Sequence, residues 1–209
     1  MTKNDLILIG AGGHARSCID VIEQEAKFKI TGLVGLESEL GSRVNGYEVI
    51  SIDGGLSNLA GKAQFAFIAL GQISSPDTRV NLFQRALNAG FELARIVSPS
   101  AYVSPSAQIG KGTIVMHGAI INSGVKVGSN CIINSRALLE HDTQVSDNCH
   151  ISTGAILNGG VLVEEGCFIG SGSVIKEGIS IGERSIVGMG SVLRSDLNDN
   201  SRFPGDSLI

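Results

Sequence analysis

The chain has 209 residues, a formal net charge of −4 and a pI near 5.5, and it lacks the basic tract expected of a nucleic-acid binder. No apolar run reaches the roughly 18–20 residues that span a bilayer, and the first residues lack the layout of a secretory signal. We therefore expect a cytoplasmic protein without nucleic-acid or membrane-inserted partners. Glycine is abundant at 28 residues, which is typical of a fold that turns often.

Residues 1–97 are predicted to form a small α/β domain, because apolar strand patterns alternate with helical ones. The segment 35–61 is poorly patterned and is expected to hold loops. The remaining elements follow in chain order: strand Asp5–Ile9, helix Ala15–Glu25, strand Lys29–Val34, strand Gln64–Leu70, helix Asp77–Ala89 and a lead-in over Phe91–Val97. This alternation favours a parallel sheet.

A glycine-rich motif joins the first expected strand to the first expected helix. The run from Gly10 to Ala15 fits G-x-G-x-x-A, whose backbone N–H groups can hold a phosphate at a helix N-terminus. A nicotinamide nucleotide would also need an acidic residue at the end of the second strand, and only Glu37 is near. We therefore expect phosphate binding without hydride transfer. The candidate substrate-binding residues are Gly10, Gly12, Gly13, His14 and Gly71.

From Val97 to Leu193 an aliphatic residue recurs at every sixth position without a break. Neither a helix nor an ordinary sheet has that period, whereas a three-sided parallel β-helix has six residues to a side and eighteen to a coil. The seventeen hexads predict between five and six coils in a second domain, residues 98–195. Residues 196–209 leave the frame and are expected to form a tail that covers the open end.

Three further positions of the hexad support this three-sided β-helix, or prism. The fourth position of the hexad is mostly glycine, which suits corners with positive φ, and the fifth is small and points inward. Cys131, Cys149 and Cys167 lie 18 apart at that fifth position, so we interpret them as interior fillers. The sixth position points outward yet is apolar, which predicts a homo-oligomer of three prisms. Its members are Ile114, Ile120, Ile132, Leu138, Ile156, Leu162, Phe168, Val174, Ile186 and Val192.

Functional residues are sought where the repeat is broken. The glycine column fails at Asn130, Arg136, Asp142 and Asn148, and His141 lies among these positions at a corner. Histidine is well suited to proton transfer near neutral pH, and the adjacent Asp142 can orient it. Gly159, one coil further on, is expected to leave space for a ligand beside the imidazole. The alternative is that His141 is a solvated corner residue.

Two other histidines have different interpretations. His150 interrupts an apolar outward column, and it is either a functional residue or a polar side chain buried at an interface and bonded to a backbone carbonyl. His117 lies where nothing else breaks the pattern, so we expect a surface residue. Because His117 and His141 occupy different corners, they do not converge as zinc ligands, and we expect no metal site.

At this point a resemblance is apparent. The run Ile7-Leu8-Ile9-Gly10-Ala11-Gly12-Gly13-His14-Ala15, joined to hexads with Glu140-His141-Asp142 and Cys149-His150-Ile151-Ser152, resembles the bacterial sugar O- and N-acetyltransferases. These include sialic acid O-acetyltransferases and the N-acetyltransferases of nucleotide-linked 4-amino sugars, as in the bacillosamine pathway. The resemblance implies a Rossmann-like nucleotide-sugar domain, then a left-handed β-helix that binds acetyl-CoA in a homotrimer.

The resemblance also assigns roles to residues. His141 matches the catalytic base and Asp142 the acidic residue beside it. The positions near acetyl-CoA correspond to Asn134, His150, Gly159 and Gly188. The chain departs from its relatives at Gly35, where uridine-nucleotide enzymes often carry Asp, and at its ending Phe203-Pro204-Gly205-Asp206, where Gly-x-Pro-Ala is usual. The sequence therefore leaves the nucleotide base and the sugar open.

The function that the resemblance implies is acetyl transfer from acetyl-CoA to the 4-amino group of a nucleotide-linked amino-deoxy sugar, for bacterial surface glycans. His141 would act as general base in a direct attack, without an acyl-enzyme. Two alternatives remain at this stage. One is a sialic acid O-acetyltransferase, in which the same base activates a hydroxyl, and the other is a non-catalytic nucleotide-binding scaffold.

Overall fold

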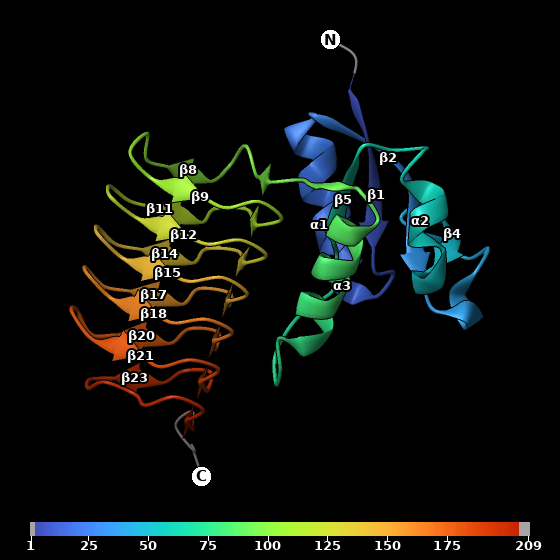
Figure 1. Cartoon of the computed structure of the whole chain (residues 1–209). Helices are drawn as coiled ribbons and strands as arrows, with labels where there is room; N and C mark the ends of the chain where they lie inside the picture. The colour runs from blue at the N-terminus through green and yellow to red at the C-terminus, as the bar shows by residue number, and fades with distance from the viewer. Residues whose placement is uncertain (1–2, 205–209) are drawn as a thin grey trace.

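The computed structural model describes residues 3–204, and these form two parts lying side by side (Figure 1). The N-terminal part is a six-stranded sheet with the order β3-β4-β2-β1-β5-β6 and helices beside it. All its pairs are parallel except β3 with β4. The strands are β1 (Asn4–Ile9), β2 (Phe28–Gly35), β3 (Arg43–Val44), β4 (Tyr47–Ile52), β5 (Phe65–Ile68) and β6 (Glu92–Leu93). The helices are α1 (Gly13–Glu25), η1 (Glu37–Glu39), η2 (Asp53–Gly55), α2 (Leu56–Leu59) and α3 (Asp77–Asn88).

The predicted strands and helices of this part are confirmed to within a few residues. The expectation of loops over residues 35–61 was wrong, because β3, β4 and α2 lie there. Their sequence is short and only partly apolar, and β4 is buried chiefly at Val49. The strand β4 is held by its pairing with β2, and β3 by its pairing with β4, which a local pattern does not reveal.

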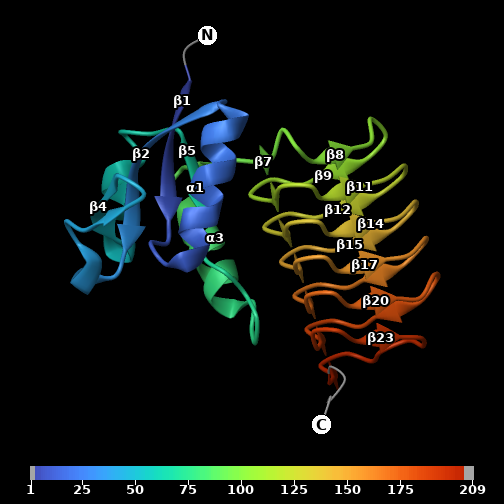
Figure 2. The same cartoon turned by 180° about the vertical axis from the view of Figure 1, so that it is seen from behind.

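The second part is the three-sided prism that the hexads predict, with strands stacked one coil apart on each side (Figures 1 and 2). Face 1 consists of β7 (Ile96–Val97), β10 (Ile114–Val115), β13 (Ile132–Ile133), β16 (His150–Ile151), β19 (Phe168–Ile169), β22 (Ile186–Val187) and β24 (Arg202–Phe203). Face 2 consists of β8 (Tyr102–Val103), β11 (Ile120–Ile121), β14 (Leu138–Leu139), β17 (Ile156–Leu157), β20 (Val174–Ile175) and β23 (Val192–Leu193). Face 3 consists of β9 (Gln108–Ile109), β12 (Lys126–Val127), β15 (Gln144–Val145), β18 (Leu162–Val163) and β21 (Ser180–Ile181).

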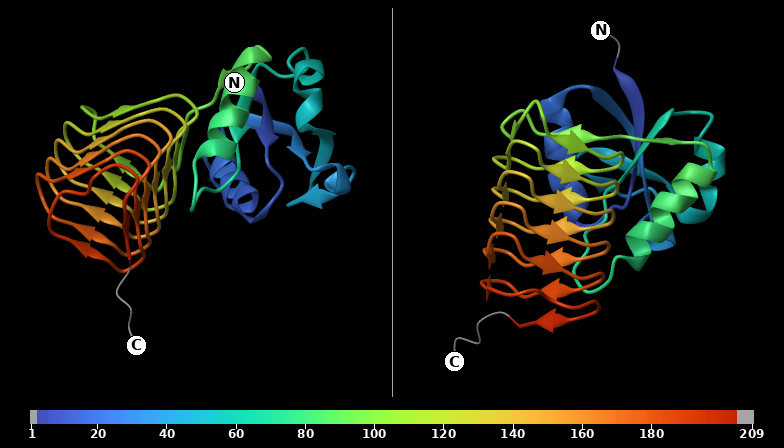
Figure 3. Two further views of the ribbon diagram at one scale, coloured as in Figure 1. Left: turned by 60° about the horizontal axis from the view of Figure 1, so that its bottom comes forward. Right: turned by 60° about the vertical axis from the view of Figure 1, so that its left-hand side comes forward.

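Successive strands of a face pair in parallel at an offset of eighteen residues, as Ile132 does with His150, except that Arg202 of β24 lies sixteen residues after its partner Ile186. The aliphatic column and the small column together fill the interior, and Cys131, Cys149 and Cys167 are fully buried in it. The prediction that these cysteines are interior fillers is confirmed. An oblique view from the C-terminal end shows the coils as triangles stacked one behind another (Figure 3, left).

The corners are left-handed, as the glycine column predicts. Nine corner glycines have φ between 66° and 74°. The positions where glycine is replaced keep the same conformation, with φ from 55° to 61° at Asn130, Arg136, Asp142, Asn148 and Arg184. Asn and Asp tolerate this region better than other residues with a side chain. The chain therefore carries side chains at corners where the backbone alone would favour glycine.

The last described residues continue the prism. Leu197 pairs with Ile181 on face 3, β24 pairs with β22 on face 1, and Leu197 and Phe203 pack against the interior. The rest of the predicted tail, including Gly205 and Asp206 of the altered ending, lies outside the described residues. Ile96–Val97 already pairs in face 1, so the first prism strand lies immediately before residue 98.

The two parts pack through face 1. Leu6, Leu8, Ile19 and Ile22 form one buried cluster with Ile96, Ile114, Met116 and Ile132. The expectation that all outward apolar columns meet another copy of the chain is therefore wrong for Ile114 and Ile132, since the N-terminal part covers them. Only tertiary structure settles this, because an outward apolar column looks the same whether its partner belongs to the same chain or to another.

Face 2 keeps an outward apolar column that the N-terminal part does not cover. Tyr102, Ile120 and Val192 are 55%, 40% and 46% exposed, and Leu138, Ile156 and Val174 between them are half-buried. Within residues 3–204 no helix is long and apolar enough to cross a membrane.

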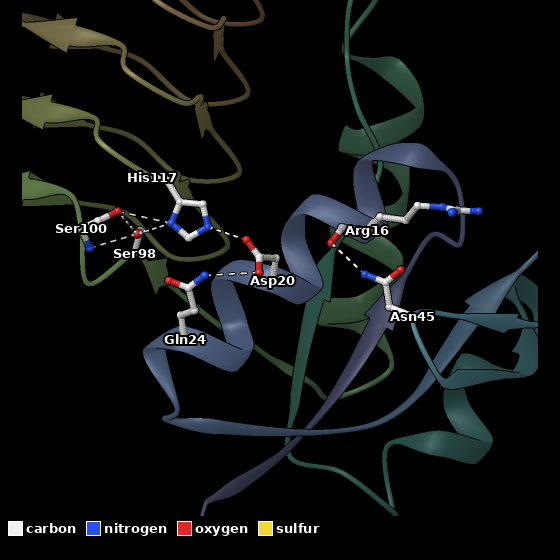
Figure 4. Close-up of polar contacts among 7 residues, drawn as sticks. All are labelled: Arg16, Asp20, Gln24, Asn45, Ser98, Ser100 and His117. Atoms are coloured by element: carbon white, nitrogen blue, oxygen red, sulfur yellow. Dashed lines mark hydrogen bonds and ion pairs between the residues drawn. The ribbon is translucent and has the colours of Figure 1, made fainter.

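His117 also joins the two parts, so the prediction of a plain surface residue was wrong. Its Nε2 lies 2.8 Å from Asp20 Oδ2 on α1, and its Nδ1 lies 2.6 Å from Ser98 Oγ (Figure 4). A Gln24 amide also donates to Asp20. The hydrogen bond from His117, followed by that from Gln24, lowers the pKa of Asp20 below its usual value.

We expect Asp20→Asn to lower the stability of the protein slightly, by about 1 kcal/mol or less, because the pair is largely exposed. A carboxylate whose pKa is depressed on folding stabilises the native state above its unfolded pKa, near 3.9. That contribution is lost as the pH falls through the folded value. In urea unfolding the difference between the wild type and Asp20→Asn should therefore be smaller at pH 3 than at pH 7. An equal difference at both pH values would contradict this assignment.

Candidate active site at a prism corner and the domain interface

His141 lies at the corner between faces 2 and 3, directly after β14. Its Nδ1 is 3.0 Å from Asp142 Oδ2, and the two side chains are 68% and 75% exposed. The carboxylate accepts the Nδ1–H, so Nε2 is left as the basic nitrogen. Asp142 reaches this position because its left-handed backbone turns its side chain over Gly124, where an added Cβ would lie 2.5 Å from Asp142 Oδ1.

The imidazole of His141 packs against Gly159 in the next coil. A Cβ built on Gly159 would lie 2.6 Å from both Cε1 and Nε2 of His141. The ring itself therefore takes up the space that the sequence was expected to leave for a ligand, which corrects that expectation. A contact between the Gly159 backbone and coenzyme A stays a prediction.

We expect Gly159→Ala to displace the His141 ring and to lower kcat by about 10–100-fold, because a shift of about 1 Å at a reacting group can cost that much. The fold should survive, since the close contact is with the end of a mobile side chain. Gly61→Ala is the matched control, because its added Cβ would meet nothing within 4 Å. Steady-state kinetics and melting curves of both variants check this. Full activity of Gly159→Ala would show that the ring position is unimportant.

His150 and Asn134 lie together on another part of the prism. His150 is on face 1 and only 6% exposed. Its Nε2 is 3.1 Å from Asn134 Nδ2, and its Nδ1 is 2.6 Å from the backbone oxygen of Gln72. The Phe168 ring packs edge-on against it, with 5.2 Å between ring centroids. This is the arrangement anticipated by the alternative interpretation of His150, a buried interface residue bonded to a backbone carbonyl.

The two histidines at the domain interface are held neutral. Burial, and next the charge of Arg79, lower the pKa of His14 to about 3. Burial is also the largest cause for His150, and it lowers that pKa to about 4. Neither group is therefore a proton-transfer group near neutral pH. His141 and Asp142 are the exposed pair.

Two residues at this interface were missed by the sequence analysis. Arg79 on α3 is 1% exposed and donates to the backbone oxygens of Ile68 and Leu70 and to Asn130, whose Oδ1 lies 2.9 Å from Nη2. Gln72 donates through Nε2 to the Asn148 oxygen at 2.9 Å. The only sequence signal for them lay in the prism, where the residues that they contact, Asn130 and Asn148, interrupt the glycine column.

A cavity with a volume of ≈ 250 Å³ lies at the carboxyl edge of the N-terminal sheet. Gly10, Gly12, Gly35 and Leu70 line it, together with the carboxylates of Glu39 and Asp53. Gly10 has a φ of 121°, and a Cβ there would lie 3.0 Å from the Ala69 carbonyl, so the turn needs glycine. Gly12 caps α1 and Gly13 begins it, and an added Cβ on either would meet nothing within 4 Å. The N–H groups in the first turn of a helix have no helical carbonyl to accept them, and those of α1 begin beside this cavity, which suits a phosphorylated ligand.

The remaining predicted residues lie elsewhere. His14 packs against Gly71, 3.8 Å from the position of an added Cβ, and turns toward the domain interface rather than into the cavity. Its Nε2 is buried without a hydrogen-bond partner in the described part of the chain. Gly188 is at the corner between faces 1 and 2, where its N–H donates to the Phe203 oxygen at 2.7 Å. The described residues hold no cluster of three His, Cys, Asp or Glu side chains suited to a metal ion.

Comparison with known families matches both parts of the chain. Residues 5–86 match the PglD N-terminal domain, residues 106–141 and 142–177 match the bacterial transferase hexapeptide (six repeats), and residues 160–195 match the hexapeptide repeat of succinyl-transferase. A search of curated protein sequences finds no match.

Solved structures resemble the whole chain. PerB from Caulobacter crescentus, in complex with CoA and GDP-perosamine, has 32% identity and a TM-score of 0.88, covering 96% of this chain and 94% of its own. The acetyltransferase domain of PglB from Neisseria gonorrhoeae, in complex with acetyl coenzyme A, has 29% identity and a TM-score of 0.87, covering 96% of each. WeeI from Acinetobacter baumannii shares the fold at 22% identity and a TM-score of 0.86, covering 97% of this chain and 98% of its own. The predicted fold class, a Rossmann-like domain followed by a left-handed β-helix, is confirmed.

Proposed function

Because the chain belongs to the bacterial sugar acetyltransferases that join a PglD-type N-terminal domain to hexapeptide repeats, we propose that it acetylates the 4-amino group of a nucleotide-linked amino-deoxy sugar with acetyl-CoA. The observation that carries this is the exposed pair of His141 and Asp142 at a prism corner, in a chain that matches, along 96% of its length, an enzyme solved with CoA and GDP-perosamine. Because acetyl-CoA and nucleotide-linked sugars are cytoplasmic metabolites, a cytoplasmic location is part of this proposal.

In the proposed reaction the acceptor amine attacks the acetyl carbonyl directly. The new N–C bond forms as the C–S bond breaks, His141 Nε2 takes the proton of the attacking amine, and the thiolate of coenzyme A leaves and is protonated. Asp142 stabilises the imidazolium through Nδ1–H. Cys131, Cys149 and Cys167 have no covalent role, since the prism interior encloses them.

A trimer supports this reaction better than a single chain does. Asn134 lies at the corner between faces 1 and 2, whereas His141 lies between faces 2 and 3, so the two flank opposite edges of face 2. In a closed ring of three copies, one edge of each prism meets the opposite edge of the next. The exposed apolar column of face 2 provides contact area for such a ring. We therefore propose active sites between copies, with acetyl-CoA along the groove and Asn134, His150, Gly159 and Gly188 beside it.

The N-terminal cavity is proposed to hold the nucleotide of the acceptor. Gly10 and Gly12 line it, and Gly13 presents an N–H at the start of α1. His14 and Gly71 pack together next to it and support the turn. Residue 35 is glycine, and an added Cβ there would lie 2.7 Å from Glu39 Oε2, so Glu39 takes the place that a side chain at residue 35 would fill.

The test is acetyl transfer with a panel of UDP-, dTDP- and GDP-linked 4-amino sugars, followed by release of free thiol and by mass spectrometry of the product. We expect turnover with at least one amino sugar and none with the corresponding 4-hydroxy sugar. A preference for sialic acid would instead support O-acetylation. Nucleotide-sugar binding without thiol release from any acceptor would support a scaffold and overturn the proposal.

A further inference from the structure

A continuous set of hydrogen bonds runs from the N-terminal part to Asn134. The loop after β5 contributes Gln72, whose backbone oxygen contacts His150 Nδ1 at 2.6 Å. His150 Nε2 contacts Asn134 Nδ2 at 3.1 Å, and Asn134 Oδ1 accepts the Ser135 N–H at 2.8 Å. Gln72 and His150 are buried, whereas Asn134 is half-buried at the corner between faces 1 and 2.

The chemistry of these groups allows one arrangement of protons. A carbonyl oxygen only accepts, so the short contact with Gln72 requires the proton on His150 Nδ1. Asn134 Oδ1 is fixed by the Ser135 N–H, so its amide nitrogen faces His150. That nitrogen only donates, so His150 Nε2 carries no proton and accepts. His150 is therefore a neutral imidazole that has no N–H left to offer a ligand.

A role for His150 as a donor to the acetyl oxygen is incompatible with this arrangement. The Asn134 amide has two hydrogens, and His150 takes one of them. The second has no acceptor among the described residues, and Asn134 is half-buried, so this hydrogen is left to bind a ligand. A donor fixed in advance toward the place where negative charge develops is the arrangement that stabilises an oxyanion.

We propose that Gln72 is a positioning residue for acetyl transfer: its carbonyl fixes His150 as an acceptor, and His150 thereby holds Asn134 with one N–H aimed at the acetyl oxygen. The proposal rests on the function proposed above. It assigns the contact with the acetyl oxygen to Asn134, and it gives Gln72 and His150 an indirect part.

The loop that carries Gln72 is itself anchored at both ends. The Gln72 amide donates to the Asn148 oxygen at 2.9 Å, across the domain interface. Two residues earlier, Leu70 lines the N-terminal cavity, and its backbone oxygen accepts from Arg79. The loop therefore touches the proposed nucleotide cavity at Leu70 and the Asn134 group at Gln72. The position of this loop therefore determines where the Gln72 carbonyl lies, and that carbonyl determines the tautomer of His150.

The first test is independent of activity. In the full-length protein labelled with ¹⁵N-histidine, His150 is expected to show a protonated Nδ1 and an unprotonated Nε2 from pH 5 to pH 8. His150→Gln identifies the signal. In Gln72→Leu, which removes the anchoring amide at similar volume, we expect a mixture of tautomers. A protonated Nε2 in the wild type would overturn the proposal. An unchanged spectrum of Gln72→Leu would show that the amide does not place the carbonyl, and it would overturn the positioning role of the Gln72 side chain.

The second test is a double-mutant cycle on kcat with the acceptor found in the panel. Asn134→Ala should lower kcat by about 10²–10³-fold and Gln72→Leu by about 10–100-fold. In the Asn134→Ala background Gln72→Leu should have no further effect, whereas Gln84→Leu, on the exposed side of α3, should be silent in both. Additive losses would show that Gln72 acts through structure alone. If no acceptor is turned over, the proposed function fails while the tautomer test still stands.

Discussion

Replacing His141 with alanine is expected to lower kcat about 10²–10⁴-fold, the usual contribution of a general base. The ring makes its polar contact with Asp142 at an exposed corner. Removing it opens no interior cavity, so the melting temperature should stay within a few degrees of the wild type. Thiol release with the preferred amino-sugar nucleotide measures the first effect, and a thermal scan measures the second.

Asp142→Asn is the informative companion to His141→Ala. Asparagine tolerates the left-handed φ of 60° at this corner at least as well as aspartate, so the backbone should not change. The loss of the carboxylate should lower kcat less than His141→Ala does, because the imidazole stays in place while its Nδ1–H loses the carboxylate that orients it. Activity of His141→Ala within a few-fold of the wild type would eliminate His141 as the base.

Arg79→Met is expected to give the largest loss of stability among these variants, about 3–5 kcal/mol. The guanidinium is enclosed between the two parts of the chain and donates to the oxygens of Ile68, Leu70 and Asn130. A methionine fills most of the volume but leaves these buried acceptors without donors, and each costs about 1–3 kcal/mol. Urea unfolding should show the lower midpoint.

Two variants make the Arg79 result interpretable. Arg79→Lys keeps the charge but lacks the planar guanidinium that donates to several carbonyls at once. We therefore expect its stability to lie between those of Arg79→Met and the wild type. Arg16→Met, on the exposed side of α1, is the matched control and should be neutral. Burial already lowers the pKa of Arg79 to about 10, so the group stays charged at neutral pH. A wild-type midpoint for Arg79→Met would show that solvent satisfies those carbonyls.

Much of the fold follows from local pattern. The interior of the prism is determined by the period of six, because each coil repeats the same pairing with its neighbours and needs no distant information. The corner glycines and the strands β1, β2 and β5 follow in the same way from φ requirements and apolar runs. His141 and Asp142 could be singled out because they interrupt that regularity at neighbouring positions.

The surface that a column of outward side chains contacts is determined by the tertiary structure alone. Ile114 and Ile120 occupy equivalent places in the hexad, yet the first is covered by the N-terminal part and the second is exposed on face 2. Tertiary structure likewise overturned the surface role expected of His117 and decided between the two interpretations of His150, since Asp20 and Gln72 lie 97 and 78 residues away in the chain. Gln72 and Arg79 had no local pattern at all. Sequence by itself determined the repeat and its interruptions, because these depend on neighbours in the chain, whereas partners across an interface depend on how two separately folded surfaces meet.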